Sequence, residues 1–257
     1  MLRVFAFTLL ILSLAPAFAA VQSKAISYQY EDIPMTGYLY WDDAIEGERP
    51  GVLVIHEWWG LNDYAKKRAA MLAELGYVAF AADMYGNNSV TDQPDQARNW
   101  MQEVTADVEG WRERALLGLE QLKASGLLAE GEVAAIGYCF GGATILQLAY
   151  ADAPLKGVVS FHGSLPAAPE ESQGKISPRI LVLHGYADDW VGPDIVSNFR
   201  TKLDAAGADW EMNSYGGVRH GFTNPDAADY GIPNLQYDAQ ADARSWQRMQ
   251  TFFDEIF

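Results

Sequence analysis

Short apolar segments alternate with helical stretches along almost the whole chain. A short apolar run predicts a buried strand, whereas apolar residues spaced three or four apart predict an amphipathic helix. The predicted strands cover residues 51–55, 77–81, 133–136, 157–161, 180–184 and 210–215. The predicted helices cover residues 62–75, 93–104, 107–124, 141–150, 193–206 and 239–257. This alternation predicts an α/β fold with a mostly parallel central sheet and helices on both faces.

Two further apolar stretches precede this alternation. Residues 26–30 and 35–41 predict a β-hairpin that turns at residues 31–34, while residues 170–177 and 224–238 are expected to be loops. No internal repeat or linker divides the chain, and one α/β domain commonly runs to about 200–250 residues. We therefore expect residues 20–257 to form a single domain, whose core draws on an apolar content of 49%.

The first 19 residues have the pattern of an export signal. Arg3 precedes an apolar run over residues 4–14, and the segment ends in Ala17-Phe18-Ala19. This pattern predicts a signal peptide that is cut after Ala19. A membrane anchor is the alternative, but the apolar run is shorter than the ~20 residues that a spanning helix needs. We expect the mature chain in the periplasm or secreted, without a stable membrane anchor.

The charge balance excludes one class of partner. The chain has 34 acidic and 18 basic residues, which gives a formal net charge of −16. Such a surface repels the phosphate backbone of nucleic acids and also anionic membranes. Nucleic acid is therefore not an expected partner, whereas a small molecule is. Neither charge nor composition predicts an oligomeric state.

Cys139 is the single cysteine, so no internal disulfide can form. It is the centre of a Gly-Tyr-Cys-Phe-Gly segment at 137–141, between a predicted strand and a predicted helix. Small neighbours permit the sharp turn of a nucleophile elbow, here with Cys in place of the usual Ser. The following helix N-terminus favours a thiolate. A buried, inert cysteine is the alternative, but the strand–turn–helix context favours catalysis.

A thiol nucleophile needs a base, and the base needs a carboxylate that orients it. On folds with such an elbow, the acid and then the base follow the nucleophile along the chain. Asp188 follows the predicted strand 180–184 and is preferred over Asp189, which could be a solvated charge or a cap. His220 lies between the last predicted strand and the last helix, where the base is expected.

The other three histidines are weaker candidates for the base. His184 ends its predicted strand and is expected to support the loop that carries the acid. His56 and His162 end strands at the same edge of the sheet and could line the site without acting as the base.

With these motifs the sequence resembles the dienelactone hydrolase family, also called carboxymethylenebutenolidases, which has the α/β-hydrolase fold. The resemblance covers nearly the whole mature chain. It rests on Gly-Tyr-Cys-Phe-Gly-Gly at 137–142, the loop with Asp188, and His-Gly-Phe at 220–222. The segments His-Glu-Trp-Trp-Gly at 56–60 and Asp-Met-Tyr-Gly at 83–86 also support it.

The resemblance implies a role for Glu57 beside the nucleophile. There it would hold the resting thiol and help to deprotonate it when substrate arrives. A surface carboxylate is the alternative, but a buried carboxyl would have a pKa that responds to substrate binding. The resemblance also implies an oxyanion hole formed by the backbone N–H groups of Trp58 and Phe140, each of which would contribute about 3 kcal/mol.

One position departs from the family pattern. Family members that act on dienelactone carry an arginine close after the Asp-Leu/Met-Tyr segment, where it binds the substrate carboxylate. Asn87 and Asn88 stand there instead, and Arg219 beside the base is the candidate replacement. This departure argues against a carboxylated dienelactone as the natural substrate.

Together these features predict a hydrolase that cleaves an ester or lactone through a Cys139–His220–Asp188 triad, with no metal or organic cofactor. Several aromatic residues are candidates for the walls of an apolar substrate pocket or for the core: Trp58, Trp59, Tyr85 and Phe222. Two rival hypotheses remain open. The chain could be an inactive secreted binding protein on the same fold, or a thiol redox sensor that pairs with an external thiol.

Overall fold

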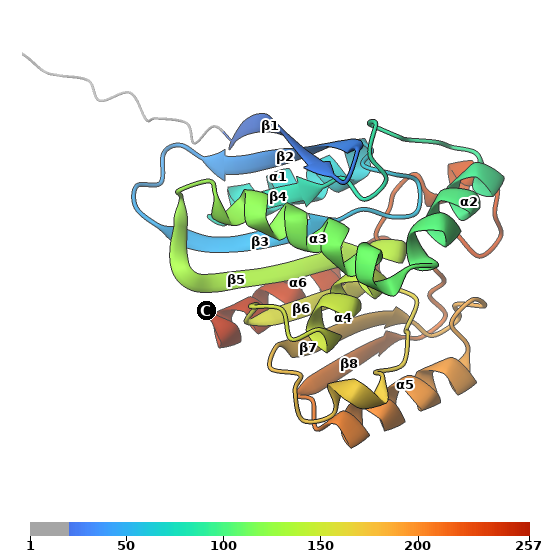
Figure 1. Ribbon diagram of the computed structural model, residues 1–257. Coiled ribbons are helices and arrows are strands. Elements are labelled where there is room, and N and C mark those ends of the chain that lie inside the picture. Colours follow the sequence, from blue (N-terminus) through green and yellow to red (C-terminus); the bar gives the residue numbers. More distant parts are fainter. Residues whose placement is uncertain (1–20) are drawn as a thin grey trace, which may run out of the picture.

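The computed structural model describes residues 21–257, so the predicted signal peptide and its cleavage site lie outside the described residues. The described chain forms an 8-stranded sheet in the order β1-β2-β4-β3-β5-β6-β7-β8 (Figure 1). Strands β3 to β8 run parallel, while β1 and β2 pair antiparallel with their neighbours. The strands are β1 (Val21–Tyr30), β2 (Ile33–Asp42), β3 (Arg49–Ile55), β4 (Val78–Ala82), β5 (Leu128–Tyr138), β6 (Gly157–Phe161), β7 (Arg179–Gly185) and β8 (Trp210–Tyr215).

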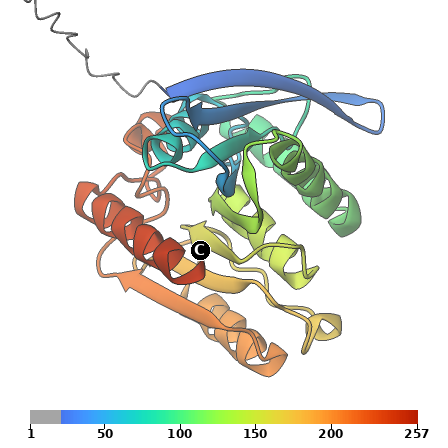
Figure 2. The same cartoon turned by 90° about the vertical axis from the view of Figure 1, so that its left-hand side faces the viewer.

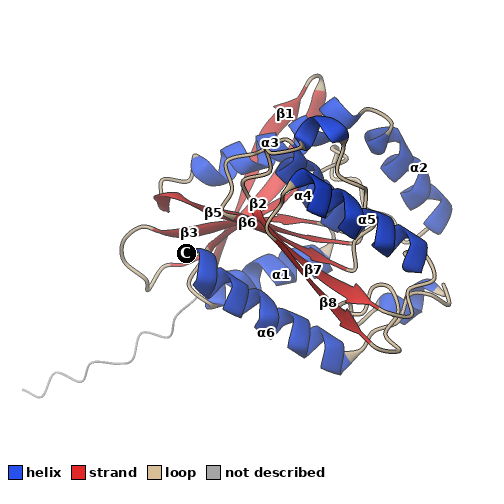
Figure 3. Ribbon diagram, turned by 90° about the horizontal axis from the view of Figure 1, so that it is seen from below, coloured by secondary structure: helices blue, strands red, loops and turns tan. Residues whose placement is uncertain are grey.

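Helices cover both faces of this sheet, and each face has its own apolar cluster. On one face lie α1 (Asp63–Glu74) and α6 (Ala239–Ile256), which pack on the side chains of one alternate set of strand residues. On the other lie α3 (Val108–Lys123), α4 (Phe140–Tyr150) and α5 (Pro193–Ala206), with α2 (Pro94–Thr105) packed against α3. Figure 3 shows the sheet between these two layers, and Figure 2 shows α6 opposite the green helices. The predicted α/β-hydrolase fold is therefore confirmed.

The predicted elements are all present, with differences at their ends. The hairpin turns over two residues only, because Ile33 already pairs with Tyr30. Strand β5 begins at Leu128 rather than at residue 133, since Leu128 pairs with Arg49 beyond a register shift. In α1, Asn62 caps the helix as expected by accepting from the N–H of Ala65.

Two expectations need correction. The helix predicted over residues 62–75 ends earlier, because Leu75 follows the last helical residue of α1 and is 43% exposed. The segments expected to be loops contain the short 3-10 helices Glu170–Ser172 and Ala227–Tyr230. Within residues 21–257, no helix is long and apolar enough to cross a membrane.

Candidate active site

Cys139 occupies a strained turn between β5 and α4. Its φ and ψ angles are 53° and −112°, a conformation that is rare for any residue other than glycine and costs about 1–3 kcal/mol. The turn also requires glycine on both sides. A Cβ on Gly137 would lie 2.0 Å from the carbonyl oxygen of Gly141, and a Cβ on Gly141 would lie 2.3 Å from that of Ile55. The predicted elbow is thus present, and it holds the thiol at the carboxyl edge of the sheet.

Asp188 and His220, the predicted acid and base, lie within hydrogen-bond distance of each other. The Nδ1 atom of His220 lies 2.7 Å from Oδ2 of Asp188, and both side chains are buried. The other carboxylate oxygen of Asp188 accepts hydrogen bonds from Nδ2 of Asn234 and from the backbone N–H of Trp190, each at 2.9 Å. The bonds from Asn234 and Trp190 fix the carboxylate, which in turn holds the imidazole in one orientation.

The neighbouring carboxylate points elsewhere. Asp189 is exposed and forms a 2.6 Å ion pair with Nη1 of Arg219 on the surface. The preference for Asp188 over Asp189 therefore agrees with the geometry, and Asp189 is the solvated charge of the alternative. Arg219 is therefore paired with Asp189 at the surface and supplies no unpaired cation to the buried site.

The charges of the pair are tuned by burial and by each other. Burial favours a protonated Asp188, but the hydrogen bond and charge of His220, with Asn234, outweigh it and lower the pKa of Asp188 to about 2. Burial lowers the pKa of His220, but the charge of Cys139 and the hydrogen bond to Asp188 outweigh it and raise that pKa to about 10. A thiolate on Cys139 and an imidazolium on His220 therefore stabilise each other.

In the described part of the chain, one nitrogen of the His220 imidazole is left free. Nδ1 of His220 is held by Asp188, and buried Nε2 has no conventional hydrogen-bond partner among the described residues. Cys139 is nevertheless close enough to act on the pKa of His220 both as a charge and as a bonding partner. We take the sulfur as the neighbour of Nε2, at a geometry looser than a standard hydrogen bond. Such loose contacts are common in resting enzymes and tighten in the substrate complex.

The other histidines have different surroundings. Nδ1 of His56 lies 2.5 Å from the carbonyl oxygen of Glu57 and its Nε2 accepts from the N–H of Met84, so both nitrogens are occupied in tying two loops together. Nε2 of His162 lies 2.7 Å from Oγ1 of Thr223, and its ring packs against that of His220 with centroids 5.2 Å apart. Within residues 21–257 neither ring is hydrogen-bonded to Asp188, the carboxylate that holds His220.

Glu57 is buried in the same cluster and is held by a residue that the sequence analysis missed. Its Oε2 accepts a 2.7 Å hydrogen bond from Nδ2 of Asn224. Burial raises the pKa of Glu57 to about 7, against the opposing effects of Asn224, His220 and Arg68. Within residues 21–257 no hydrogen bond joins Glu57 to Cys139, so the hold on the resting thiol that the resemblance implies stays a prediction.

The two expected oxyanion donors are free. Among the described residues, neither the backbone N–H of Trp58 nor that of Phe140 has an acceptor. Phe140 begins α4, where the first N–H groups have no partner within the helix. The carbonyl of Trp58 is fixed by a 3.0 Å bond from the hydroxyl of Tyr85, which orients the peptide that follows β3.

The expected aromatic walls are divided between site and core. The ring of Tyr85 stacks against Phe140 at a centroid distance of 5.6 Å, and burial together with charge at Cys139 raises the pKa of Tyr85. Trp59 is almost completely buried and stacks on Tyr230 at 3.9 Å. Phe222 is fully buried in the core on the α1/α6 face. Only Tyr85 of these three lies beside the nucleophile.

An apolar groove opens next to the elbow. Its volume is about 350 Å³, and its lining contains no charged side chain. Trp190 links it to the triad, since its ring lies 4.8 Å from that of His220 and 5.8 Å from that of Trp58. The groove is lined by Met101, Thr105, Trp111, Phe140, Ala143, Ser164, Leu165, Pro166, Trp190, Val191 and Ile195. We call this surface the acyl groove.

The position of the absent family arginine lies apart from this groove. Asn87 lines a different cavity of about 220 Å³ together with Tyr85 and Arg114. Arg114 donates to the carbonyl of Met84 and lies over the ring of Tyr30, so it is committed to the scaffold. Neither Asn87 nor the surface-paired Arg219 supplies a cation to the acyl groove.

A polar layer behind the triad was not predicted. Thr223 receives the contact from His162 and lies 2.5 Å from the hydroxyl of Tyr64, while its carbonyl accepts from Arg68. Arg68 also forms a 2.6 Å ion pair with Asp242 of α6. This layer anchors residues 223–224, and hence Asn224, to both helices of that face. The only signal in the sequence was polar residues directly after His-Gly-Phe, which is equally typical of a surface loop.

Comparison with known proteins agrees with this architecture. The model of the dienelactone hydrolase family matches residues 35–257. The crystal structure of a dienelactone hydrolase-like promiscuous phosphotriesterase from metagenomic libraries is similar with a TM-score of 0.90 and 39% identity, covering 93% of this chain and 99% of that one. A relative from Aquifex pyrophilus named protein usf is 30% identical, over 80% of this chain and 88% of its own. A relative from Saccharolobus solfataricus, named as a candidate carboxymethylenebutenolidase, is 29% identical, over 82% and 91%.

Proposed function

The chain belongs to the dienelactone hydrolase family, and on that premise we propose that it hydrolyses an ester or lactone through a thioester on Cys139. The observation that carries the proposal is the 2.7 Å bond between Asp188 and His220 beside a buried thiol on a strained elbow. Strain at a single non-glycine residue persists where function requires the geometry. An inert core cysteine would need neither the strain nor a buried imidazole–carboxylate pair.

Acylation begins with transfer of the thiol proton from Cys139 to Nε2 of His220. The thiolate attacks the substrate carbonyl, and the C=O electron pair moves onto oxygen. The N–H groups of Trp58 and Phe140 receive this oxyanion, because neither has another acceptor among the described residues. Collapse re-forms the C=O bond and breaks the C–O bond to the leaving group, which takes the proton from His220. A lactone ring opens in the same step and leaves its hydroxyl on the acyl chain.

Deacylation repeats the sequence with water. His220 takes a proton from water as the oxygen attacks the thioester carbonyl, and the same two N–H groups hold the second oxyanion. Collapse breaks the C–S bond, the proton on His220 returns to sulfur, and the carboxylic acid leaves. Asp188 stays ionised throughout and keeps the imidazole in the correct tautomer. Glu57 assists when ionised, because its charge favours the imidazolium of His220.

The acyl groove supports a substrate with an uncharged, apolar acyl group. Its lining offers aromatic and aliphatic surface next to Phe140 and no cation for a second carboxylate. A buried carboxylate without a partner would be costly there. We therefore favour neutral esters and lactones over carboxylated dienelactones.

A second activity is supported by one relative. The metagenomic structure at 39% identity is described as a promiscuous phosphotriesterase. A phosphoryl oxygen could occupy the oxyanion position, and the thiolate of Cys139 could attack phosphorus as it attacks carbon. We propose slow phosphotriester hydrolysis as a side activity, to be measured as release of p-nitrophenol from paraoxon. Release no faster than in a Cys139→Ala control would remove this proposal.

We also propose that the chain is exported, on the pattern of residues 1–19 alone. Expression in a bacterial host, followed by fractionation and mass measurement, tests this. The expected product is a periplasmic or secreted chain that begins at Ala20, whereas an uncleaved cytoplasmic chain would contradict the proposal.

Thiol alkylation tests the main proposal against its rivals. A catalytic thiol beside His220 should react rapidly with iodoacetamide, lose p-nitrophenyl ester turnover in proportion, and be protected by a slowly turned-over ester. An inactive binding protein would show no turnover to lose. A redox sensor would react but would show neither turnover nor protection. Slow alkylation together with undiminished turnover would refute the thioester.

A further inference from the structure

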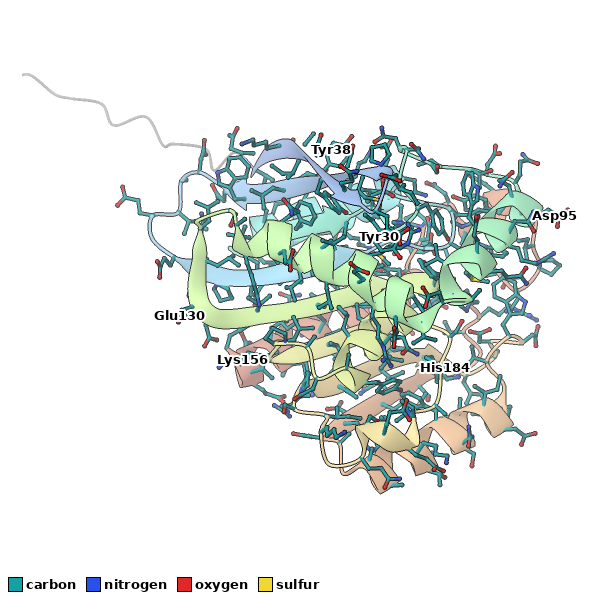
Figure 4. The ribbon with its side chains drawn as sticks, in the orientation of Figure 1. Tyr30, Tyr38, Asp95, Glu130, Lys156 and His184 are labelled. Atoms are coloured by element: carbon teal, nitrogen blue, oxygen red, sulfur yellow. The ribbon has the colours of Figure 1, made fainter. Side chains whose placement is uncertain are left out.

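A third cavity lies beside the loop that carries Asp188. It has a volume of about 440 Å³ and is bounded by β7, β8 and α5. Figure 4 labels His184 at the end of β7, next to α5. The cavity is lined by His184, Tyr186, Val191, Pro193, Val196, Ser197, Arg200, Trp210, Met212 and Ser214. We call it the β8 trough. Its volume is in the range of small-molecule sites, which is about 300–1,000 Å³.

His184 lies in the wall of this trough with its hydrogen bonds unmade. The residue is only 4% exposed, and its buried Nδ1 atom has no partner. No hydrogen bond joins either ring nitrogen to another residue within 21–257. Buried polar side chains are normally hydrogen-bonded, and an exception needs an explanation. The other ring nitrogen, Nε2, is not fully buried, and a ligand hydroxyl in the trough would supply its missing partner.

Arg200 supplies an unpaired cation at the trough. Its guanidinium lies over the ring of Trp210, 5.8 Å from the centroid. It forms no ion pair with any described residue, although the chain carries almost twice as many acidic as basic side chains. Asp204, one turn further along α5, accepts from the indole N–H of Trp210 instead. No carboxylate is among the residues that line the trough.

The register of the sheet gives the distance between His184 and the pair formed by Arg200 and Trp210. His184 pairs with Ser214, four residues along β8 from Trp210. Side chains at alternate positions of a strand lie on one face, so Trp210, Met212 and Ser214 all face α5. At ~3.3 Å per residue, the aromatic–cationic end and the histidine end are about 13 Å apart. Met212 and Val196 supply apolar wall between them.

We propose that the β8 trough binds an elongated aromatic carboxylate that carries a hydroxyl at its far end. The carboxylate bonds to Arg200, the ring packs along Trp210 and Met212, and the hydroxyl reaches His184. A 4-hydroxycinnamate has this order of groups and a length suited to the spacing. Cys139, Asp188 and His220 are not among the residues that line the trough, and only Val191 is shared with the acyl groove. The proposal does not depend on the hydrolytic function.

Calorimetric titration of the full mature chain with 4-hydroxycinnamate tests the site. Binding is expected for the wild type and should be about tenfold or more weaker for Arg200→Gln, because a charge-assisted bond is lost. The matched control is Arg244→Gln on α6, since Arg244 also forms no ion pair with a described residue. That variant should bind within about twofold of wild type. Equal affinities for Arg200→Gln and wild type would overturn the proposal.

Two analogues separate the ends of the ligand. Cinnamate lacks the hydroxyl and 4-hydroxycinnamyl alcohol lacks the carboxylate, so each should bind more weakly than 4-hydroxycinnamate. Equal affinity of the alcohol would contradict the role of Arg200, and equal affinity of cinnamate would contradict the role of His184. Inorganic phosphate should not compete with 4-hydroxycinnamate, because it lacks the ring. Full competition would mean that Arg200 binds any anion without help from the rest of the trough, and it would overturn the proposal.

A blocking variant distinguishes the trough from the other places where an aromatic acid could bind. Ser197 is exposed on α5, so Ser197→Trp should fill the trough, abolish binding and leave p-nitrophenyl acetate turnover unchanged. Alkylation of Cys139 should leave binding unchanged. Loss of binding on alkylation would assign the ligand to the catalytic site instead. The wild type could also fail to bind 4-hydroxycinnamate and form a dimer that Ser197→Trp dissociates. That result would overturn the proposal and identify a second copy of the chain as the occupant of the trough.

Discussion

Asn224 donates a 2.7 Å hydrogen bond to Glu57, and the two side chains are 1% and 3% exposed. The orientation of the amide is fixed, because its carbonyl oxygen accepts from the N–H of Asp226. Asn224 therefore presents N–H to the carboxyl and favours its ionised form. This neutral donor offsets only part of the cost of burial, and the pKa of Glu57 stays near 7. Glu57 can thus change its charge under the conditions in which such an enzyme works.

Replacing Glu57 with glutamine should change how stability depends on pH. Burial raises the folded-state pKa of Glu57 from 4.5 to about 7. The folded wild type therefore loses stability as pH rises through this interval, whereas Glu57→Gln has no proton to lose there. We expect Glu57→Gln to be more stable than wild type by about 3 kcal/mol at pH 8 and similar at pH 4.5. Urea unfolding at both pH values measures this, with exposed Glu74→Gln as the control. A variant equally destabilised at both values would contradict it.

Removing the donor should shift the activity profile instead. Asn224→Leu keeps the approximate volume but withdraws the hydrogen bond that lowers the pKa of Glu57. Because ionised Glu57 favours the imidazolium of His220, activity should rise as Glu57 loses its proton. The acid limb of kcat/KM should therefore move to higher pH in Asn224→Leu. The exposed Asn198→Leu on α5 should leave it in place. An acid limb that is unchanged in Asn224→Leu, or that moves to lower pH, would contradict this role of Glu57.

The two adjacent aspartates should differ sharply in their effect on rate. Asp188 holds Nδ1 of His220, so Asp188→Asn should lower kcat/KM for a p-nitrophenyl ester by about 10²–10⁴-fold. Asp189 pairs only with exposed Arg219, and Asp189→Asn should stay within about twofold of wild type. Steady-state kinetics of both variants provides the comparison. Similar losses in the two would mean that the loop is needed but that Asp188 has no specific role.

A charge at the rim of the acyl groove should alter acyl-chain preference. Ile195 is 43% exposed and lines the groove, so Ile195→Asp should weaken the binding of a long apolar acyl group. We expect kcat/KM for p-nitrophenyl hexanoate to fall about tenfold relative to the acetate, as the loss of two or three buried methylene contacts implies. Val108→Asp, at a position 41% exposed on α3, is the matched control. An unchanged hexanoate-to-acetate ratio in Ile195→Asp would place the acyl group elsewhere.

Much of this site was predictable because its parts follow strands. Cys139 and Asp188 come directly after buried apolar runs, and His220 follows the last strand after a short turn; parallel strands bring such ends to one edge of the sheet. The glycines around Cys139 disclosed the elbow for a steric reason, since a Cβ at 137 or 141 would strike backbone atoms. The strand ends and the glycine positions depend on residues that are neighbours in the chain. A short sequence motif can therefore predict them.

The partners that tune the site were not predictable in this way. Asn224 lies 167 residues from Glu57 along the chain, and Asn234 lies 46 residues from Asp188. Both asparagines belong to a segment whose composition indicates only a loop. The two roles open to Phe222 and Trp59 could not be separated for a related reason: an aromatic residue next to a motif is compatible with core packing or with substrate contact. Only the packing of Trp59 on Tyr230, and of Phe222 against α6-side residues, decides between them.

The central claim is that the sulfur of Cys139 carries the acyl group. Wild type and Cys139→Ala should be compared for turnover of a p-nitrophenyl ester, with mass measurement of the acid-quenched wild-type protein. We expect turnover to fall to the background rate in Cys139→Ala, and the quenched wild type to carry one acyl group on the peptide that contains Cys139. Equal rates in the two proteins, or an acyl group on another residue, would contradict the account.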